Sequence, residues 1–273
     1  MRSVEYYQNG DLKLAYSKEG SGPVVIFMHG IGGNRSNWDE QQTALSNHYC
    51  TIAWDARGYG ESSDPVQPLE FSDFADDLNA LLDHLDVKLA HLVGLSMGGM
   101  IAQEFYGRYP QRVATLTLAD SSQGFGAADE AERKDFLSRR LAPLESGLTP
   151  ADLAPTMIDV LTGPKATDEM RRRLLDSLSA VRTGPYIQAL KATVTTDFRN
   201  ILPKIDVPTL VIVGSEDKVL APEESELLAD AISGAKLETI EHAGHLSNIE
   251  APERFNFILT EFLGRHAALA DTM

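Results

Sequence analysis

Cysteine is nearly absent from this sequence of 273 residues, in which Cys50 is the only one. A single thiol cannot form an intramolecular disulfide, as is usual for proteins of a reducing compartment. The first residues also lack the apolar core of a secretory signal peptide. We therefore expect a cytoplasmic protein. Cys50 lies inside an apolar run, with no turn to present its thiol, so we interpret it as a buried apolar residue.

Basic residues are scarce as well. The sequence has 24 Lys and Arg against 40 Asp and Glu, which gives a formal net charge of -16. A surface of this charge repels nucleic-acid phosphates and anionic membrane headgroups. No apolar run approaches the roughly 18 residues that a membrane-spanning helix needs. We therefore expect neither nucleic acid nor a membrane as a partner. The sequence contains no pattern that indicates an oligomeric state.

Short apolar runs alternate with helical patterns at both ends of the chain, which is typical of a parallel sheet covered by helices on both faces. The expected strands are 3–7, 12–17, 24–28, the run that leads to Gly94, 49–54, 113–119, 209–213 and 236–240. The expected helices are 37–45, 71–85, the segment from Met100 to Tyr109, 223–232 and 252–265. We expect the tail after His266 to be frayed.

The segment 124–199 differs from its surroundings. It contains four successive helical patterns and no convincing strand, with the helices expected at 129–144, 151–161, 168–181 and 185–194. It has 11 basic and 11 acidic residues, whereas the remainder has 13 and 29. We therefore predict a core made of residues 1–123 and 200–273, with a formally neutral helical cap, or lid, at 124–199.

The segment 94–98 fits the pattern G-x-S-x-G between an apolar run and a helical pattern. This spacing is typical of a nucleophile elbow, a strained turn that presents a serine hydroxyl above the edge of a sheet. The following helix directs its N-terminal N–H groups toward the reaction centre, where negative charge develops. Ser96 is therefore the candidate nucleophile. The competing interpretation is a turn of small residues in an ordinary strand–helix unit.

A serine hydroxyl needs a base, and the base needs an acid to orient it. In elbow-type hydrolases the chain order is serine, acid, histidine. Asp217 follows the strand 209–213 and His245 follows the strand 236–240, so both are expected at the same sheet edge as Ser96. Glu216 and, more seriously, Asp120 remain alternative acids.

The other histidines are expected to have other roles. His242 lies nearer the end of its strand and is interpreted as structural. His29 begins a glycine-rich turn that it is expected to brace. The remaining histidines are expected at surface or helix positions: His48, His84, His91 and His266.

Two backbone N–H groups are expected to bind the oxyanion that forms during acyl transfer. They belong to Met97, which follows the nucleophile, and to Ile31, which lies in the turn after His29. Gly32 and Gly33 would let the substrate carbonyl approach. The predicted substrate-binding residues are Gly32, Trp38, Leu220 and Leu246. No metal-ligand cluster or phosphate-binding loop is apparent, so we predict no cofactor and no metal.

With these residues assembled, the chain resembles the α/β-hydrolase superfamily along nearly its whole length. Within it, the chain is most similar to the 3-oxoadipate enol-lactonases and related hydrolases of small esters and lactones. The resemblance rests on GLSMGGMIAQ at 94–103, DARGYGES at 55–62 and AGHLSNIEAPERF at 243–255. It implies an α/β-hydrolase fold with a mostly parallel, eight-stranded sheet, flanking helices and a helical cap. It also implies that Ser96, Asp217 and His245 form a catalytic triad.

The resemblance leaves the substrate open. Enol-lactonases often have a serine where this chain has Gly30, and the same turn with Trp38 also suits C–C hydrolases and carboxylesterases. C–C hydrolases often carry a polar residue at the position of Leu95 and a tryptophan at that of Leu246, which this chain lacks. The leading hypothesis is a serine hydrolase that cleaves a small ester or lactone. The alternatives are a C–C hydrolase with the same triad and a small-ligand receptor of this fold.

The predicted cap is rich in arginine, which could read a carboxylate on the substrate. Successive helical residues turn by about 100°, so at most one or two of these arginines can point into a pocket. The competing interpretation is a set of surface ion pairs with Asp168, Glu169 and Asp176. The arginines are Arg139, Arg140, Arg171, Arg172, Arg173 and Arg182.

Overall fold

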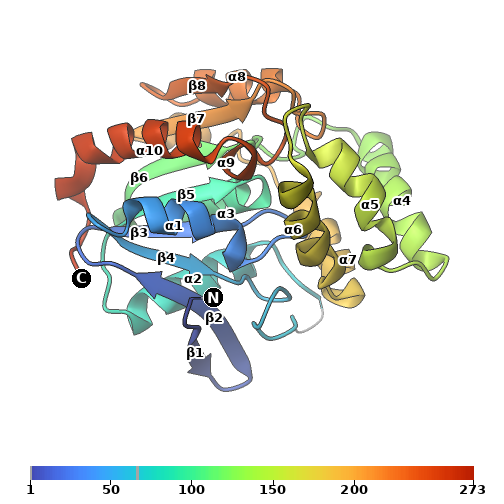
Figure 1. Ribbon diagram of the computed structural model, residues 1–273, viewed down its shortest axis with the longest axis horizontal. Coiled ribbons are helices and arrows are strands. Elements are labelled where there is room, and N and C mark those ends of the chain that lie inside the picture. The colour runs from blue at the N-terminus through green and yellow to red at the C-terminus, as the bar shows by residue number, and fades with distance from the viewer. Residues whose placement is uncertain (1, 66–67) are drawn as a thin grey trace.

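The computed structural model describes residues 2–65 and 68–273. Its centre is a sheet of eight strands in the order β1-β2-β4-β3-β5-β6-β7-β8 (Figure 1). The first two strands are antiparallel to their neighbours, and β3 to β8 are parallel. This confirms the predicted fold class. The strands are β1 (Glu5–Asn9), β2 (Leu12–Glu19), β3 (Val24–Met28), β4 (Cys50–Trp54), β5 (Ala90–Leu95), β6 (Val113–Ala119), β7 (Thr209–Gly214) and β8 (Lys236–Ile240).

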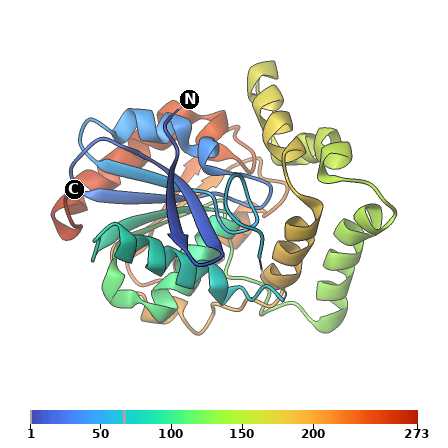
Figure 2. The same ribbon diagram turned by 90° about the horizontal axis from the view of Figure 1, so that it is seen from below.

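The central strands are completely buried because helices cover both faces of the sheet. One core packs the sheet against α2 (Ser72–His84), α3 (Met97–Arg108) and α8 (Pro222–Asp230). The other packs it against α1 (Asp39–Leu45) and α10 (Pro252–His266). The two groups of helices lie on opposite sides of the sheet (Figure 2). The short helix α9 (Ser247–Glu250) and the four 3-10 turns were not predicted.

Four helices between β6 and β7 lie together beside one end of the sheet in both views (Figures 1 and 2). They are α4 (Glu130–Glu145), α5 (Pro150–Leu161), α6 (Asp168–Ser179) and α7 (Thr183–Thr193). Side-chain caps explain three of their starts, because Asp129, Thr149 and Thr167 each accept a hydrogen bond from a first-turn N–H. Their apolar faces form small clusters of their own, such as Leu174, Leu178 and Ile158 between α5 and α6.

Two sequence expectations were wrong. The tail is not frayed: Asp271 accepts hydrogen bonds from the N–H groups of Lys88 and Leu89, and Thr272 bridges to Pro23. His91 is not at the surface but lies buried in β5, where Nδ1 contacts Thr115 Oγ1 at 2.9 Å. In both cases a polar group is paired by a partner far away in sequence, which local patterns do not reveal. Cys50 is buried as expected.

Within the described residues, no helix has the length and apolarity needed to cross a membrane.

Candidate active site

Ser96 stands between β5 and α3 with φ 54° and ψ -117°, a conformation that a non-glycine residue rarely adopts. The strain is tolerated because the surrounding backbone holds the turn. The Ser96 N–H donates to the carbonyl of Ala119, and the Ser121 hydroxyl donates to the carbonyl of Ser96 at 2.9 Å. The structure thus contains the sharp turn that the pattern G-x-S-x-G predicts.

The two pattern glycines allow the strand and helix to cross closely. A Cβ on Gly94 would lie 2.2 Å from the carbonyl oxygen of Gly98. A Cβ on Gly98 would lie 2.1 Å from the carbonyl oxygen of Met28, on β3. Any larger residue at either position would push the helix away from the sheet and displace Ser96.

The loops after β7 and β8 bring two further residues to Ser96. His245 Nε2 lies 2.9 Å from Ser96 Oγ, and His245 Nδ1 lies 2.7 Å from Asp217 Oδ2. All three residues come from the carboxyl ends of parallel strands, which explains why residues so far apart in sequence meet at one edge. The arrangement can pass a proton from the serine hydroxyl to the imidazole.

Asp217 is itself held in place. Its Oδ1 accepts hydrogen bonds from the N–H groups of Val219 at 2.8 Å and Leu220 at 3.0 Å, which leaves Oδ2 for the imidazole. Burial of His245 opposes the charged imidazolium. The hydrogen bond and charge of Asp217, with smaller contributions from Asp120 and Glu250, outweigh burial and raise the pKa of His245 above its ordinary value.

Asp120, the main alternative acid, is completely buried and faces other partners. It accepts hydrogen bonds from the Gly214 N–H at 2.8 Å and the Ser247 hydroxyl at 2.5 Å. Burial raises its pKa to about 7, although nearby His245 opposes the rise. Asp120 thus links the end of β7 to α9. The other alternative acid, Glu216, is exposed.

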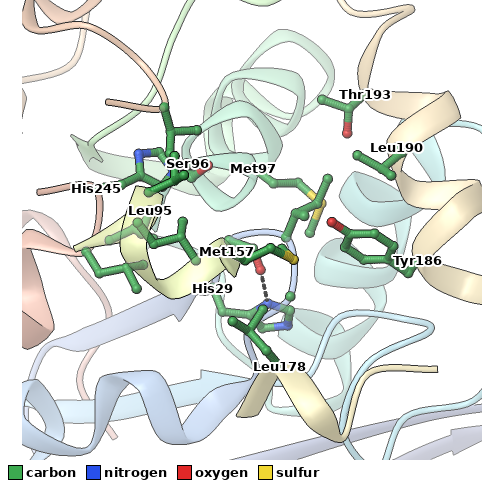
Figure 3. Close-up of a pocket in the computed structure, with 18 of the residues that line it drawn as sticks. His29, Leu95, Ser96, Met97, Met157, Leu178, Tyr186, Leu190, Thr193 and His245 are labelled. Atoms are coloured by element: carbon green, nitrogen blue, oxygen red, sulfur yellow. Dashed lines mark hydrogen bonds between the residues drawn. The ribbon is translucent and has the colours of Figure 1, made fainter. Parts of the chain in front are cut away.

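The competing histidines do not approach Ser96 in this way. His29 braces the turn after β3, because Nδ1 donates to the Gly30 carbonyl at 2.8 Å and Nε2 accepts from the Ala56 N–H at 3.1 Å (Figure 3). Burial lowers its pKa, which favours the neutral ring that these contacts require. His242 is exposed, with φ 66°, at the end of β8.

A cavity of about 410 Å³ opens above Ser96, a size typical of small-molecule sites. Ile31 and Met97 line it, and Met97 is the first residue of α3, where N–H groups have no carbonyl partner within the helix. The predicted substrate-binding residues line it too: Gly32, Trp38, Leu220 and Leu246. Trp38 contributes from a fully buried position, stacked on Phe27 with ring centroids 4.9 Å apart.

Much of the opposite wall comes from α5, α6 and α7, in the segment predicted as the cap, although the sequence did not indicate which of their residues line the pocket. Met157, Leu178 and Tyr186 face the Ser96 side of the cavity across its width (Figure 3). The helical periodicity of these segments indicates which face of each helix is apolar. It does not indicate which residues of that face line a cavity. Only the packing of the helices against the sheet brings Met157, Leu178 and Tyr186 into the cavity wall.

Glu250 is a further residue that sequence reasoning missed. Its carboxylate accepts hydrogen bonds from the N–H groups of Gly163 at 2.6 Å and Gly244 at 3.0 Å. It thereby ties the loop after α5 to the loop that carries His245. Burial raises the pKa of Glu250. In the sequence, Glu250 is distinguished only by its place in the stretch 243–255, which carries the family resemblance.

Among residues 2–65 and 68–273, no cluster of His, Cys, Asp and Glu is suited to hold a metal ion.

Comparison with known proteins agrees with this geometry. The family model of the alpha/beta hydrolase fold matches residues 23–252. The 3-oxoadipate enol-lactonase 2 of Acinetobacter baylyi is 32% identical over 258 residues, which cover 93% of this chain and 94% of the relative.

Solved structures give the same result. A thermophilic esterase from Thermogutta terrifontis, with malate bound, matches with a TM-score of 0.87 and 32% sequence identity. The match covers 97% of this chain and 99% of the esterase chain. The enol-lactonase from Burkholderia xenovorans LB400 matches with a TM-score of 0.85 and 27% sequence identity. The match covers 95% of this chain and 100% of the enol-lactonase chain. This chain therefore belongs to the α/β-hydrolase family.

Proposed function

We propose that the protein is a serine hydrolase that cleaves a small carboxylic ester or lactone through an acyl-enzyme. The observation that carries this proposal is the hydrogen-bonded series Ser96–His245–Asp217, with distances of 2.9 Å and 2.7 Å, which brings Ser96 and His245 into the wall of the cavity. The names of the enol-lactonase and esterase relatives support the same reaction class.

The proposed reaction begins with attack of Ser96 Oγ on the substrate carbonyl while His245 Nε2 accepts the hydroxyl proton. Asp217 keeps Nδ1 protonated and stabilises the imidazolium that forms. The N–H groups of Ile31 and Met97 stabilise the oxyanion. His245 then protonates the leaving oxygen, and water, activated by the same imidazole, hydrolyses the acyl-enzyme. In a lactone the leaving oxygen remains part of the acyl chain, so hydrolysis of the acyl-enzyme releases a single ring-opened acid.

We also propose that the helical segment 124–199 acts as a cap over this site, with the remaining chain as the core. Pocket residues of α5, α6 and α7 support this assignment because they face Ser96 from the far wall. A cap of this kind limits access of water and selects the substrate by shape.

The proposal is tested by assaying the purified protein on lactones, aryl esters and dienoic ring-fission products. We expect rapid hydrolysis of at least one ester or lactone. Turnover of the ring-fission products alone would favour the C–C hydrolase, which uses the same residues. Tight binding of a ligand with negligible turnover of every compound would favour the receptor.

The pH dependence is a further prediction. His245 must be neutral to accept the Ser96 proton, so kcat/KM should rise with pH through the pKa of His245 and then level off. Because Asp217 raises that pKa, the midpoint should lie above the ordinary histidine value of about 6.5. The measurement uses a neutral ester under conditions where acylation limits the rate. A flat profile between about pH 5 and 9 would contradict the role of His245 as base.

A further inference from the structure

The loop between α5 and α6 lies directly against the loop that carries His245. The His245 N–H donates to the carbonyl of Leu161, the last residue of α5, at 2.9 Å. The Glu250 carboxylate joins the same two loops a second time, because its two oxygens accept from the N–H groups of Gly163 and Gly244. Glu250 is only 8% exposed, and a charge-assisted hydrogen bond is stronger away from water. The backbone around the proposed base is therefore bonded to the helical segment.

Each loop has a glycine at this contact, and neither position has room for a side chain. A Cβ on Gly163 would lie 2.7 Å from the Gly244 nitrogen and 2.8 Å from the His242 carbonyl oxygen. A Cβ on Gly244 would lie 2.5 Å from the Gly163 nitrogen. The obstructing atoms belong to the backbone and cannot turn aside as a flexible side chain can, so a larger residue must separate the loops. Neither Gly163 nor Glu250 is among the residues that line the cavity.

α5 and α6 also form a wall of the cavity, so the same pair of helices touches both the substrate space and the His245 loop. Met157 and Leu178 face the cavity (Figure 3). Ile158 of α5 and Leu178 of α6 belong to one apolar cluster with Ile249 of α9, the helix that directly follows the His245 loop. Close-packed side chains transmit displacement. A shift of α5 and α6 would therefore carry the His245 loop with it.

The helical segment is bonded to the core at further points. The Ser177 hydroxyl of α6 accepts from the Asn34 amide, in the turn after β3, at 3.0 Å. The paired arginines of the segment use carboxylates other than the expected Asp168, Glu169 and Asp176, and two of these pairs reach the core. The observed pairs are Arg139 with Asp135, Arg171 with Asp159, Arg173 with Glu40, and Arg182 with Asp64.

We propose that Glu250 and Gly163 are positioning residues, through which the docked helices α5 and α6 hold His245 in line with Ser96. Both act through the His245 loop, since neither bonds to Ser96 nor lines the cavity. The distance of 2.9 Å between His245 Nε2 and Ser96 Oγ suits proton transfer. Misplacement of a catalytic group by about 1 Å can cost about 100-fold in rate. The helical segment then sets the position of the base, besides forming a wall around the substrate. This inference rests on the proposed hydrolase function.

The first test compares two glycines of the helical segment on 4-nitrophenyl butyrate. Gly163→Ala should lower kcat by about 10–100-fold and change KM less than about threefold, because the loops separate while the cavity wall keeps its residues. The variant changes no charge, so the loss reports displacement of His245. Gly184→Ala is the matched control, because Gly184 is exposed at the start of α7 and a Cβ there meets open space. It should keep kcat within about twofold of wild type.

Glu250→Gln tests the other side of the contact at nearly unchanged size, and it decides the matter if Gly163→Ala does not fold. The amide has one oxygen and one NH₂ group, so one of the two N–H donors then faces another donor. We expect kcat for the same ester to fall about 10-fold or more, with KM nearly constant. Glu253→Gln is the matched control, because Glu253 is exposed in the first turn of α10, and it should keep kcat within about twofold. The double variant Gly163→Ala/Glu250→Gln should lose about as much as the stronger single variant, because both substitutions break one contact.

Hydrogen exchange separates this inference from the hydrolase proposal. The N–H groups of Gly163, Gly244 and His245 should exchange slowly in the wild type, and both single variants should speed exchange in both loops. That result in a protein that hydrolyses no ester would support the docking of the loops and contradict only the hydrolase function. The positioning role is overturned if the wild type hydrolyses the ester and both variants, with native circular dichroism, keep kcat within about threefold. It is also overturned if the losses multiply in the double variant, or if Gly163→Ala speeds exchange in its own loop and not in the His245 loop.

Discussion

Ser96→Ala should lower kcat for any ester or lactone substrate by about 10⁴-fold or more. The variant removes the oxygen that His245 Nε2 contacts at 2.9 Å and that forms the acyl bond. The fold should be unaffected, since the turn is held by backbone contacts of residue 96 and by the glycines on either side. Residual activity should come from the oxyanion N–H groups and from substrate binding.

Steady-state kinetics and covalent labelling together check this prediction. A fluorophosphonate should add one label to the wild-type protein and none to Ser96→Ala. Ser146→Ala is the matched control, because Ser146 is an exposed serine at the end of α4. It should keep full activity and labelling. Activity of Ser96→Ala within tenfold of wild type, with its circular dichroism unchanged, would show that another residue is the nucleophile.

The sheet could be predicted from sequence because its signals are local. Continuous apolar runs such as 24–28 and 113–119 are typical of strands buried on both faces, and the observed β3 and β6 have the same bounds. The chain order of Ser96, Asp217 and His245 placed them at successive strand ends of one parallel sheet, so their meeting at one edge followed from topology.

What could not be predicted depends on contacts between distant segments. The contacts of Arg139 with Asp135 and of Arg140 with Phe136 are local, each spanning one turn of α4, but only the packing of α4 on α7 shows that this part of α4 lines the cavity. Likewise, the role of Asp271 depends on N–H groups 182 and 183 residues away. Side-chain partners of this kind leave no periodic signal in the sequence.

The choice between two buried acids gives the second large expected effect. Asp217→Asn should lower kcat by about 10⁴-fold, because an amide cannot hold His245 in the tautomer that accepts the serine proton. Asp217 Oδ2 lies 2.7 Å from His245 Nδ1, and its other oxygen is fixed by two backbone N–H groups, so the amide nitrogen would face the ring. Its NH₂ would then favour the tautomer with the proton on Nε2, facing Ser96.

Asp120→Asn should lower kcat less than about tenfold, since Asp120 contacts Gly214 and Ser247 and bonds to neither His245 nor Ser96. With a pKa of about 7, Asp120 is partly protonated near neutral pH, and asparagine resembles that neutral form in size and hydrogen bonding. The two variants are compared on one neutral ester over a range of pH. Asp120→Asn should also lower the midpoint of the pH profile, because the Asp120 charge helps to raise the pKa of His245. If Asp120→Asn lost more activity than Asp217→Asn, the catalytic acid would be Asp120, and the contact between Asp217 and His245 would be structural.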